Sequence, residues 1–126
     1  MFSSSRSLCE KDIHIIRNDD VIRIIAFIPP GHHHTRLLIE LGDRVLVLQE
    51  ATVSALVRAY VNVALHPTRK VYECLTKTMS KKEKKLGFAR IQLLETNRTE
   101  EEVLNEIKCV IDKLFSSKNN SNLRSG

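Results

Sequence analysis

The chain has 126 residues, of which 42% are hydrophobic and 28% are charged, and its formal net charge is +5. This length suits a single domain, and the balance of apolar and charged residues is that of a globular protein rather than a disordered one. No apolar run approaches the roughly 18 residues of a membrane span, and the first residues lack the apolar stretch of a signal peptide. We therefore expect a cytoplasmic protein, or a nuclear one where the host has a nucleus, with no membrane contact.

The first 11 residues are expected to be flexible, and two strands are predicted after them, over about 12–17 and 21–28. The turn residues Asn18, Asp19 and Asp20 separate these strands. The second predicted strand has apolar residues on both faces, a pattern typical of a central strand.

A tight antiparallel hairpin is predicted next, within "TRLLIELGDRVLVLQEA". Residues 36–41 alternate in polarity as a first strand, and Gly42 and Asp43 supply a two-residue turn. Residues 45–48 then form the second strand, which runs antiparallel to the first.

After the hairpin, the spacing of the apolar residues changes from that of a strand to that of a helix. Thr52 can cap this helix, and Pro67 ends it. Its polar residues recur every fourth position and form one narrow stripe: Ser54, Arg58, Asn62 and His66. Because the rest of its circumference is apolar, the helix is expected to be covered on more than one side. The surplus surface is either internal or a dimer or subunit interface, for which the candidate residues are Leu56, Ala59, Tyr60 and Val63.

The remaining chain predicts two more helices and a strand. Thr68 can cap a helix that carries Met79 on its apolar face, and Ser80 with Glu83 forms a capping box for a short basic turn. "FARIQLLE" alternates as a last strand. A helix from Thr99 to Phe115 opens on a second capping box and is followed by a disordered tail over 116–126.

These elements predict one α+β domain over residues 12–115, in the order ββββ-α-α-β-α. The sheet is expected to be antiparallel, with four to five strands and with helices packed on one face. Three cysteines at wide spacing, Cys9, Cys74 and Cys109, make a disulfide framework improbable. Cys74 and Cys109 fall beside apolar helical positions, which favours small buried hydrophobic side chains.

The segment "IPPGHHHTR" is the first candidate for chemistry. Successive side chains of an extended segment point to opposite sides, so His32 and His34 can converge while His33 faces away. No acid or cysteine partner in a metal-ligand pattern accompanies them, so an exposed polar loop is favoured over a metal site. Contact with an anionic ligand, beside Arg36, is the third interpretation. No nucleophile, phosphate-loop or dinucleotide motif is present, so we expect no catalytic residue, no cofactor and no enzyme.

Positive charge is concentrated between His66 and Arg90, where eight Lys and Arg residues face two Glu residues, a net +6. Such a cluster can neutralise phosphates, although it is also what a solvated helix end looks like. The candidate nucleic-acid-binding residues are Arg36, Arg69, Lys70, Lys81, Lys82, Lys84, Lys85 and Arg90. Few aromatic residues accompany them, so contact is expected through the backbone phosphates, without base stacking.

The segment from Thr35 to Leu75 resembles the hairpin and helix of the small dimerisation subunit of the KEOPS tRNA-modification complex. The matching residues are Gly42, Ser54, Ala55, Leu56, Ala59 and Asn62. The resemblance covers about a third of the chain, and it implies a homodimer that docks a catalytic partner. The chain departs from that family where it continues through a basic segment, a strand and a long helix. Its lysine- and isoleucine-rich composition without tryptophan also resembles that of small archaeal proteins.

Three functions follow as expectations. The first is a self-associating binding protein that contacts nucleic acid, RNA rather than DNA, or a ribonucleoprotein partner through the basic cluster. The second is a subunit that binds only proteins, with lysines that serve solubility. An enzyme that uses the histidine loop is the third alternative.

Overall fold

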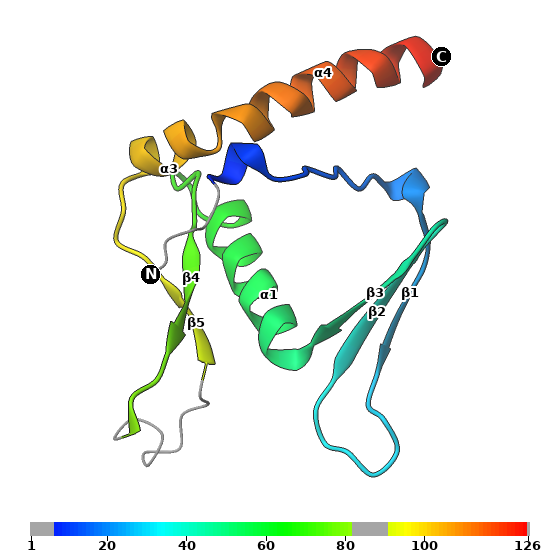
Figure 1. Cartoon of the computed structure of the whole chain (residues 1–126), viewed down its shortest axis with the longest axis vertical. Helices are drawn as coiled ribbons and strands as arrows, with labels where there is room; N and C mark the ends of the chain where they lie inside the picture. Colours follow the sequence, from blue (N-terminus) through cyan, green and yellow to red (C-terminus); the bar gives the residue numbers. More distant parts are fainter. Residues whose placement is uncertain (1–6, 82–90, 126) are drawn as a thin grey trace. The chain divides into compact units, whose positions relative to one another are not determined.

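The computed structural model describes residues 7–81 and 91–125, and these residues form an α+β structure (Figure 1). They divide into two compact units, one formed by residues from both ends of the chain, up to Ile16 and from Thr99 onward, and the other formed by Arg17–Arg98. The elements, in chain order, are η1 (Leu8–Glu10), η2 (Asn18–Asp20), β1 (Val21–Phe27), β2 (Arg36–Leu41), β3 (Val45–Gln49), α1 (Glu50–Ala64), β4 (Cys74–Thr78), β5 (Ile91–Glu95), α3 (Glu100–Glu106) and α4 (Lys108–Ser125).

The unit Arg17–Arg98 begins with a three-stranded antiparallel sheet in which β2 lies between β1 and β3 (Figure 1). The hairpin of β2 and β3 confirms the prediction made from Gly42 and Asp43. β1 is an edge strand of this sheet, so its interpretation as a central strand is wrong. The predicted strand over 12–17 is not formed, because these residues lie extended without a strand partner among the described residues.

Both faces of this sheet are apolar. Since residues that pair directly share a face, the register places one row on each side. One row is Ile24, Ile39 and Leu46, and the other is Ile25, Leu38 and Val47. An antiparallel sheet usually covers one apolar face and solvates a polar one, so this sheet carries more apolar surface than a single layer can bury.

Helix α1 follows β3 without a loop. The helix begins at Glu50 and its N-cap is Gln49, which makes no side-chain capping bond, so the cap expected at Thr52 is wrong. The difference arises because β3 passes directly into the helix. Thr52 therefore lies inside the first turn of α1, where it cannot act as the N-cap. α1 contacts β2, β3 and β5.

The helix expected after Thr68 is wrong, because β4 occupies Cys74–Thr78 and pairs with β5. Its apolar residues have helical spacing, but the strand ends in "TKT", and threonine is β-branched and favours a strand. Two sheets, of three and two strands, are therefore present among the described residues, and neither the single sheet nor the predicted element order is confirmed. The predicted last strand is confirmed as β5. The predicted capping box of Ser80 with Glu83 is not tested, because Glu83 lies outside the described residues.

The unit formed by the chain ends contains α3 and α4. Thr99 caps α3 as predicted, since its hydroxyl accepts from the Glu102 backbone N–H at 3.1 Å and the Glu102 carboxylate accepts from the Thr99 backbone N–H at 2.9 Å. The helix breaks at Ile107, so the expected single helix is two. α4 is helical to Ser125, whereas disorder of the tail from 116 stays a prediction.

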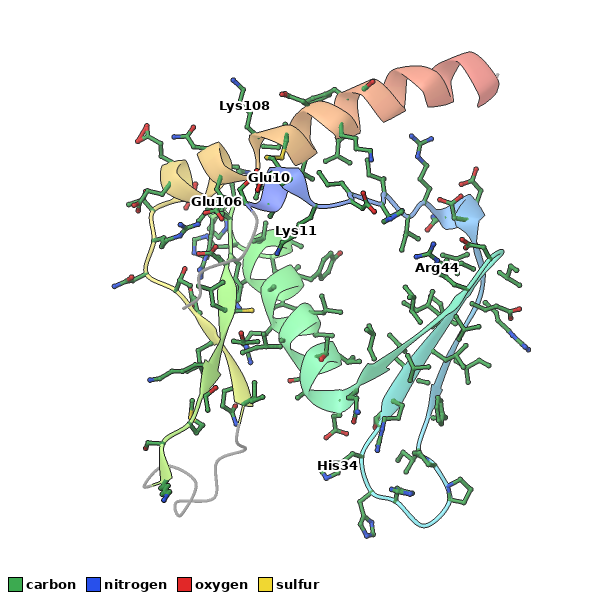
Figure 2. All side chains as sticks on the ribbon, viewed as in Figure 1. Glu10, Lys11, His34, Arg44, Glu106 and Lys108 are labelled. Carbon is green, nitrogen blue, oxygen red and sulfur yellow. A yellow bond between two sulfur atoms is a disulfide. The ribbon has the colours of Figure 1, made fainter. Side chains whose placement is uncertain are left out.

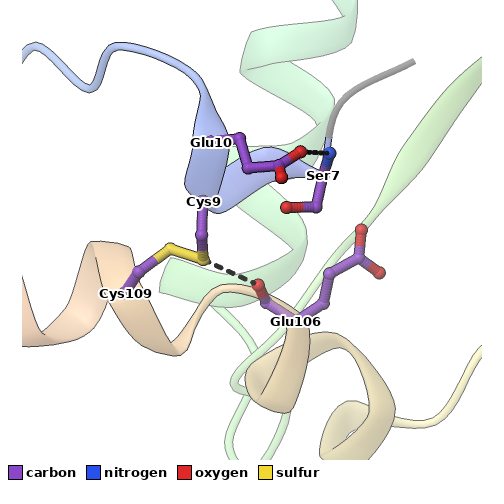
Figure 3. The surroundings of a disulfide bond; sticks show 5 residues. All are labelled: Ser7, Cys9, Glu10, Glu106 and Cys109. Carbon is purple, nitrogen blue, oxygen red and sulfur yellow. Dashed lines mark hydrogen bonds between the residues drawn. A yellow bond between two sulfur atoms is a disulfide. The ribbon is translucent and has the colours of Figure 1, made fainter. Parts of the chain in front are cut away.

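A disulfide joins Cys9, in η1, to Cys109, in the first turn of α4 (Figure 3). Their Cα atoms are 5.9 Å apart and their sequence separation is 100. The expectation of no disulfide and of a buried Cys109 thiol is therefore wrong. Cys74 is free and half-buried on β4.

Candidate functional site

The polar stripe of α1 is tied to the β4–β5 hairpin and its surroundings. The Arg58 guanidinium donates to the Tyr72 hydroxyl at 2.9 Å and to the backbone carbonyl of Leu93, in β5, at 2.7 Å. The bond to Tyr72 is the largest cause that raises the pKa of Arg58 above its ordinary value. Asn62, one turn later, donates to the Arg58 carbonyl at 2.8 Å. The polar side of the helix is thus directed at its own fold.

The large apolar side chains of α1 are exposed instead. Together with the C-cap residue Leu65 we call them the α1 face, which consists of Leu56, Val57, Tyr60, Val61 and Leu65. Tyr60 is 70% exposed and Leu65 is 76% exposed. At helical spacing these residues lie next to one another on one half of the helix circumference. The five residues are uncharged, and the charged residue on the same half is Glu50, in the first turn of the helix.

The side of α1 that faces its own unit carries smaller residues. Ala55 is buried, and Ala59 and Val63 are half-buried. Of the predicted interface residues, the structure therefore places Leu56 and Tyr60 at the surface, whereas Ala59 and Val63 lie partly inside. A helix usually directs its largest apolar side chains inward, so α1 has the reverse arrangement.

Strand β1 adds a second apolar surface. Ile22 and Ile24 are each 61% exposed, and Ile25 is also exposed. The strand carries one charge, Arg23, which is neutralised by the Glu40 carboxylate at 2.6 Å. Edge strands are commonly protected by a bulge, lysine, proline or a cover; β1 has a register irregularity between Val21 and Arg23 and, among the described residues, none of the other three.

The histidine loop joins β1 to β2, and Figure 2 shows His34 beside the start of α1. The Glu50 carboxylate accepts the Thr35 backbone N–H at 2.7 Å and lies 3.2 Å from His34 Nδ1. These contacts, the Thr35 bond first, hold the pKa of Glu50 below its ordinary value of 4.5. The Arg36 guanidinium donates to the His34 carbonyl at 2.6 Å.

A shallow hollow of about 400 Å³ lies beside this contact, lined by His34, Arg36, Gln49, Glu50, Ala51 and Ser54. His32 and His33 are exposed, and the His32 N–H closes a turn onto the Pro29 carbonyl at 3.0 Å. In the described part of the chain, no group of three His, Cys, Asp or Glu side chains is placed to hold a metal ion. The loop is anchored through His34 and Glu50.

The predicted basic cluster is described only in part. Arg69 is engaged within the fold, because its guanidinium pairs with Glu95, donates to the Val71 carbonyl at 3.0 Å and lies 4.8 Å from the centre of the Tyr72 ring. Lys70 and Lys81 are exposed. Lys82, Lys84, Lys85 and Arg90 lie outside the described residues. Arg36 lies on the three-stranded sheet, apart in sequence from the others.

Sequence reasoning missed the pairing of Cys9 with Cys109 and the contact of Glu50 with Thr35. No local pattern indicates the first, since 100 positions separate the two cysteines. An acidic residue in the first turn of α1 is a signal for the second, because carboxylates favour helix N-termini.

None of the helices within residues 7–81 and 91–125 combines the length and the hydropathy that crossing a bilayer requires. Comparisons with family models, with curated proteins and with solved structures find no match to this chain. The resemblance of Thr35–Leu75 to the KEOPS subunit therefore stays an expectation from the sequence.

Proposed function

We propose that this chain is a non-enzymatic protein-association subunit, and that its α1 face packs against the α1 face of a second copy. One observation carries the proposal, which is the reversed arrangement of α1. Its polar stripe is bonded internally through Arg58, while Leu56, Tyr60 and Leu65 are exposed. A helix of this kind gains free energy when a partner removes its outward apolar side from water.

A second copy is the partner that suits the charge pattern of this surface. A twofold axis places the same patch of each copy against itself, so a patch with charge of one sign would repel its image. The α1 face carries no charge, and two such faces can pack without burying an unpaired ion. The resemblance of Thr35–Leu75 to a dimerisation subunit also favours self-association.

The experiment compares two leucines with nearly equal exposure on different elements. Leu56, in the α1 face, is 54% exposed, and Leu75, on β4, is 56% exposed. Sedimentation equilibrium of the wild type, Leu56→Glu and Leu75→Glu is measured over a range of concentrations. We expect the wild type and Leu75→Glu to dimerise, and Leu56→Glu to dimerise at least about tenfold more weakly, because it would bury a charge in the interface.

Three outcomes contradict this proposal. A wild type that is monomeric at every concentration removes self-association, and equal weakening by the two substitutions removes the α1 face as its site. Undiminished dimerisation of Leu56→Glu also removes that face and directs attention to β1.

Contact with nucleic acid is the second candidate function, and the net charge of +6 between His66 and Arg90 favours it. Such contact would use backbone phosphates, so its affinity would fall steeply with salt. Because Arg69 is engaged with Glu95, the lysines from Lys81 to Lys85 are the residues to test.

The test measures binding of single-stranded and double-stranded RNA and DNA in a salt series. The fourfold charge reversal of Lys81, Lys82, Lys84 and Lys85 to Glu is expected to abolish binding. Reversal of Lys11 and Lys108, which are exposed and lie outside the cluster, serves as a control of smaller charge change. Absence of wild-type binding at low salt, or binding that the fourfold reversal leaves unchanged, would exclude this second function.

A further inference from the structure

Residues Ser7–Ile16 form an extended strap in the unit that contains α3 and α4 (Figure 1). Apart from the short turn η1, the strap has no regular secondary structure. Ile13 and Ile15 are half-buried, and the Lys113 ammonium donates to the Ile13 carbonyl. A segment of this kind has few backbone bonds of its own, so its position depends on what attaches it.

The covalent attachment is the Cys9–Cys109 disulfide, and its two sulfurs differ in environment. Cys9 is exposed, whereas Cys109 is half-buried. Cys9 Sγ lies 3.8 Å from the backbone carbonyl oxygen of Glu106, the last residue of α3 (Figure 3). A reagent in solution can therefore reach Cys9, and a thiol formed there would find a hydrogen-bond acceptor in place. Exposed disulfides of this kind exchange more readily than buried ones.

We propose that Cys9–Cys109 is a redox-controlled clasp, closed when oxidised and opened by a thiol reductant, that holds the strap on α3 and α4. The thiolate of the reductant attacks Cys9 Sγ, the bond between Cys9 and Cys109 breaks, and its electron pair leaves with Cys109 Sγ. A second thiol of the reductant then attacks the reductant's sulfur in the mixed disulfide, and Cys9 Sγ leaves as a thiolate. Two electrons and two protons pass to the two cysteines, and the reductant leaves as its own disulfide.

Opening of the clasp changes how the strap is held. In the reduced chain the strap retains the Lys113 bond and the partial burial of Ile13 and Ile15. The covalent tether no longer restricts the ends of a loop with a sequence separation of 100, so the strap leaves and returns as a local opening.

The first experiment counts thiols in the full-length native protein. Alkylation followed by intact mass measurement is expected to find one reactive thiol, that of Cys74, in the oxidised protein and three after treatment with reduced glutathione. Three reactive thiols in protein prepared under oxidising conditions would show that the clasp does not form. A disulfide that survives excess reduced glutathione in the native state would show that it is not a redox switch.

The second experiment measures hydrogen exchange of the Glu10 and Lys11 amides of the strap, which donate to the Ser7 and Leu8 carbonyls, in the oxidised and the reduced protein. Reduction is expected to speed this exchange by about tenfold or more while amides of β2 stay unchanged. Cys9→Ser and Cys109→Ser are expected to behave like the reduced wild type in either buffer, and Cys74→Ser is expected to keep the full response. Equal strap exchange in the two states, with the disulfide confirmed by mass, would overturn the clasp. If one of the Cys→Ser variants fails to fold, as judged by β2 exchange, the comparison of oxidised with reduced wild type still tests the clasp.

Discussion

At the scale of single residues, Glu50 is the group that ties the histidine loop to α1. Its carboxylate accepts from the Thr35 backbone N–H, and this bond is the main cause of its lowered pKa. A carboxyl whose pKa is lower in the folded state than its ordinary 4.5 stabilises the fold. This contribution is complete above pH 4.5 and is lost as the pH falls through the lowered value.

We predict that the Glu50 carboxyl titrates with a midpoint below 4.5, and that the Thr35 amide resonance shifts with the same midpoint. An NMR titration of both signals measures this directly. Glu50→Gln keeps the length of the side chain and removes the charge, so the Thr35 amide should then show no such step. A Glu50 midpoint at or above 4.5 would contradict the contact.

Arg69 belongs to the predicted nucleic-acid cluster, yet its bonds are structural. Its guanidinium pairs with Glu95, donates to Val71 and stacks over Tyr72, and its side chain is 27% exposed. Lysine cannot reproduce this planar set of donors.

We therefore predict that Arg69→Lys lowers the free energy of unfolding by about 1–2 kcal/mol, as measured in urea. Lys77, which is exposed on β4, provides the control. Lys77→Arg should change the unfolding free energy by less than about 0.5 kcal/mol. Equal stability of Arg69→Lys and the wild type would show that its guanidinium contacts contribute little in solution.

At the scale of elements, the sequence predicts those features that depend only on neighbouring residues. The turn at Gly42 and Asp43 and the capping box at Thr99 and Glu102 depend on a few neighbouring residues, and both are found. The helix predicted over 68–79 is wrong because the apolar residues there fit a helical period, while the pairing of β4 with β5 depends on residues 13 to 21 positions away, from Thr78 with Ile91 to Cys74 with Glu95. Long-range pairing leaves no mark in a local period.

In the candidate site, too, the local features are predicted and the long-range contacts are not. The excess of apolar residues on α1 is visible in the sequence, and it led to Leu56 and Tyr60, which are exposed. Which half of the helix faces outward depends on the bonds of Arg58 to Tyr72 and Leu93, and no local pattern contains these. For that reason the sequence also predicts Ala59 and Val63 as interface residues, although both lie partly inside the fold.

Two threonines offer a matched test of helix capping. Thr99 caps α3 in the structure, whereas Thr68, which the sequence also predicted as a cap, begins no helix there. We predict that Thr99→Ala costs about 1 kcal/mol of local stability and speeds exchange of the Val103 amide by about fivefold. Val103 is a sensitive reporter, because its N–H bonds the Thr99 carbonyl at 3.1 Å. Thr68→Ala should leave that exchange rate unchanged, and an equal effect of the two substitutions would contradict the assignment.

At the scale of the whole molecule, the disulfide connects the parts of the chain that flank Arg17–Arg98. A cross-link stabilises a fold chiefly by restricting the unfolded chain, and its effect grows slowly with loop length. With a sequence separation of 100, we predict that reduction lowers the free energy of unfolding by about 2–4 kcal/mol. Urea unfolding with and without reductant measures the difference, with Cys9→Ser as the control that should show none. An unfolding midpoint that reductant does not move would contradict it.

The same bond has a practical consequence for any preparation of this protein. The backbone from Cys9 to Cys109, together with the disulfide, forms a closed covalent ring. A protease that cuts once inside this ring opens it without releasing a fragment, so the product keeps the mass of the intact chain plus one water. The cut becomes visible only on a reducing gel, where the two pieces separate, and a single band on a non-reducing gel is no proof that the backbone is whole.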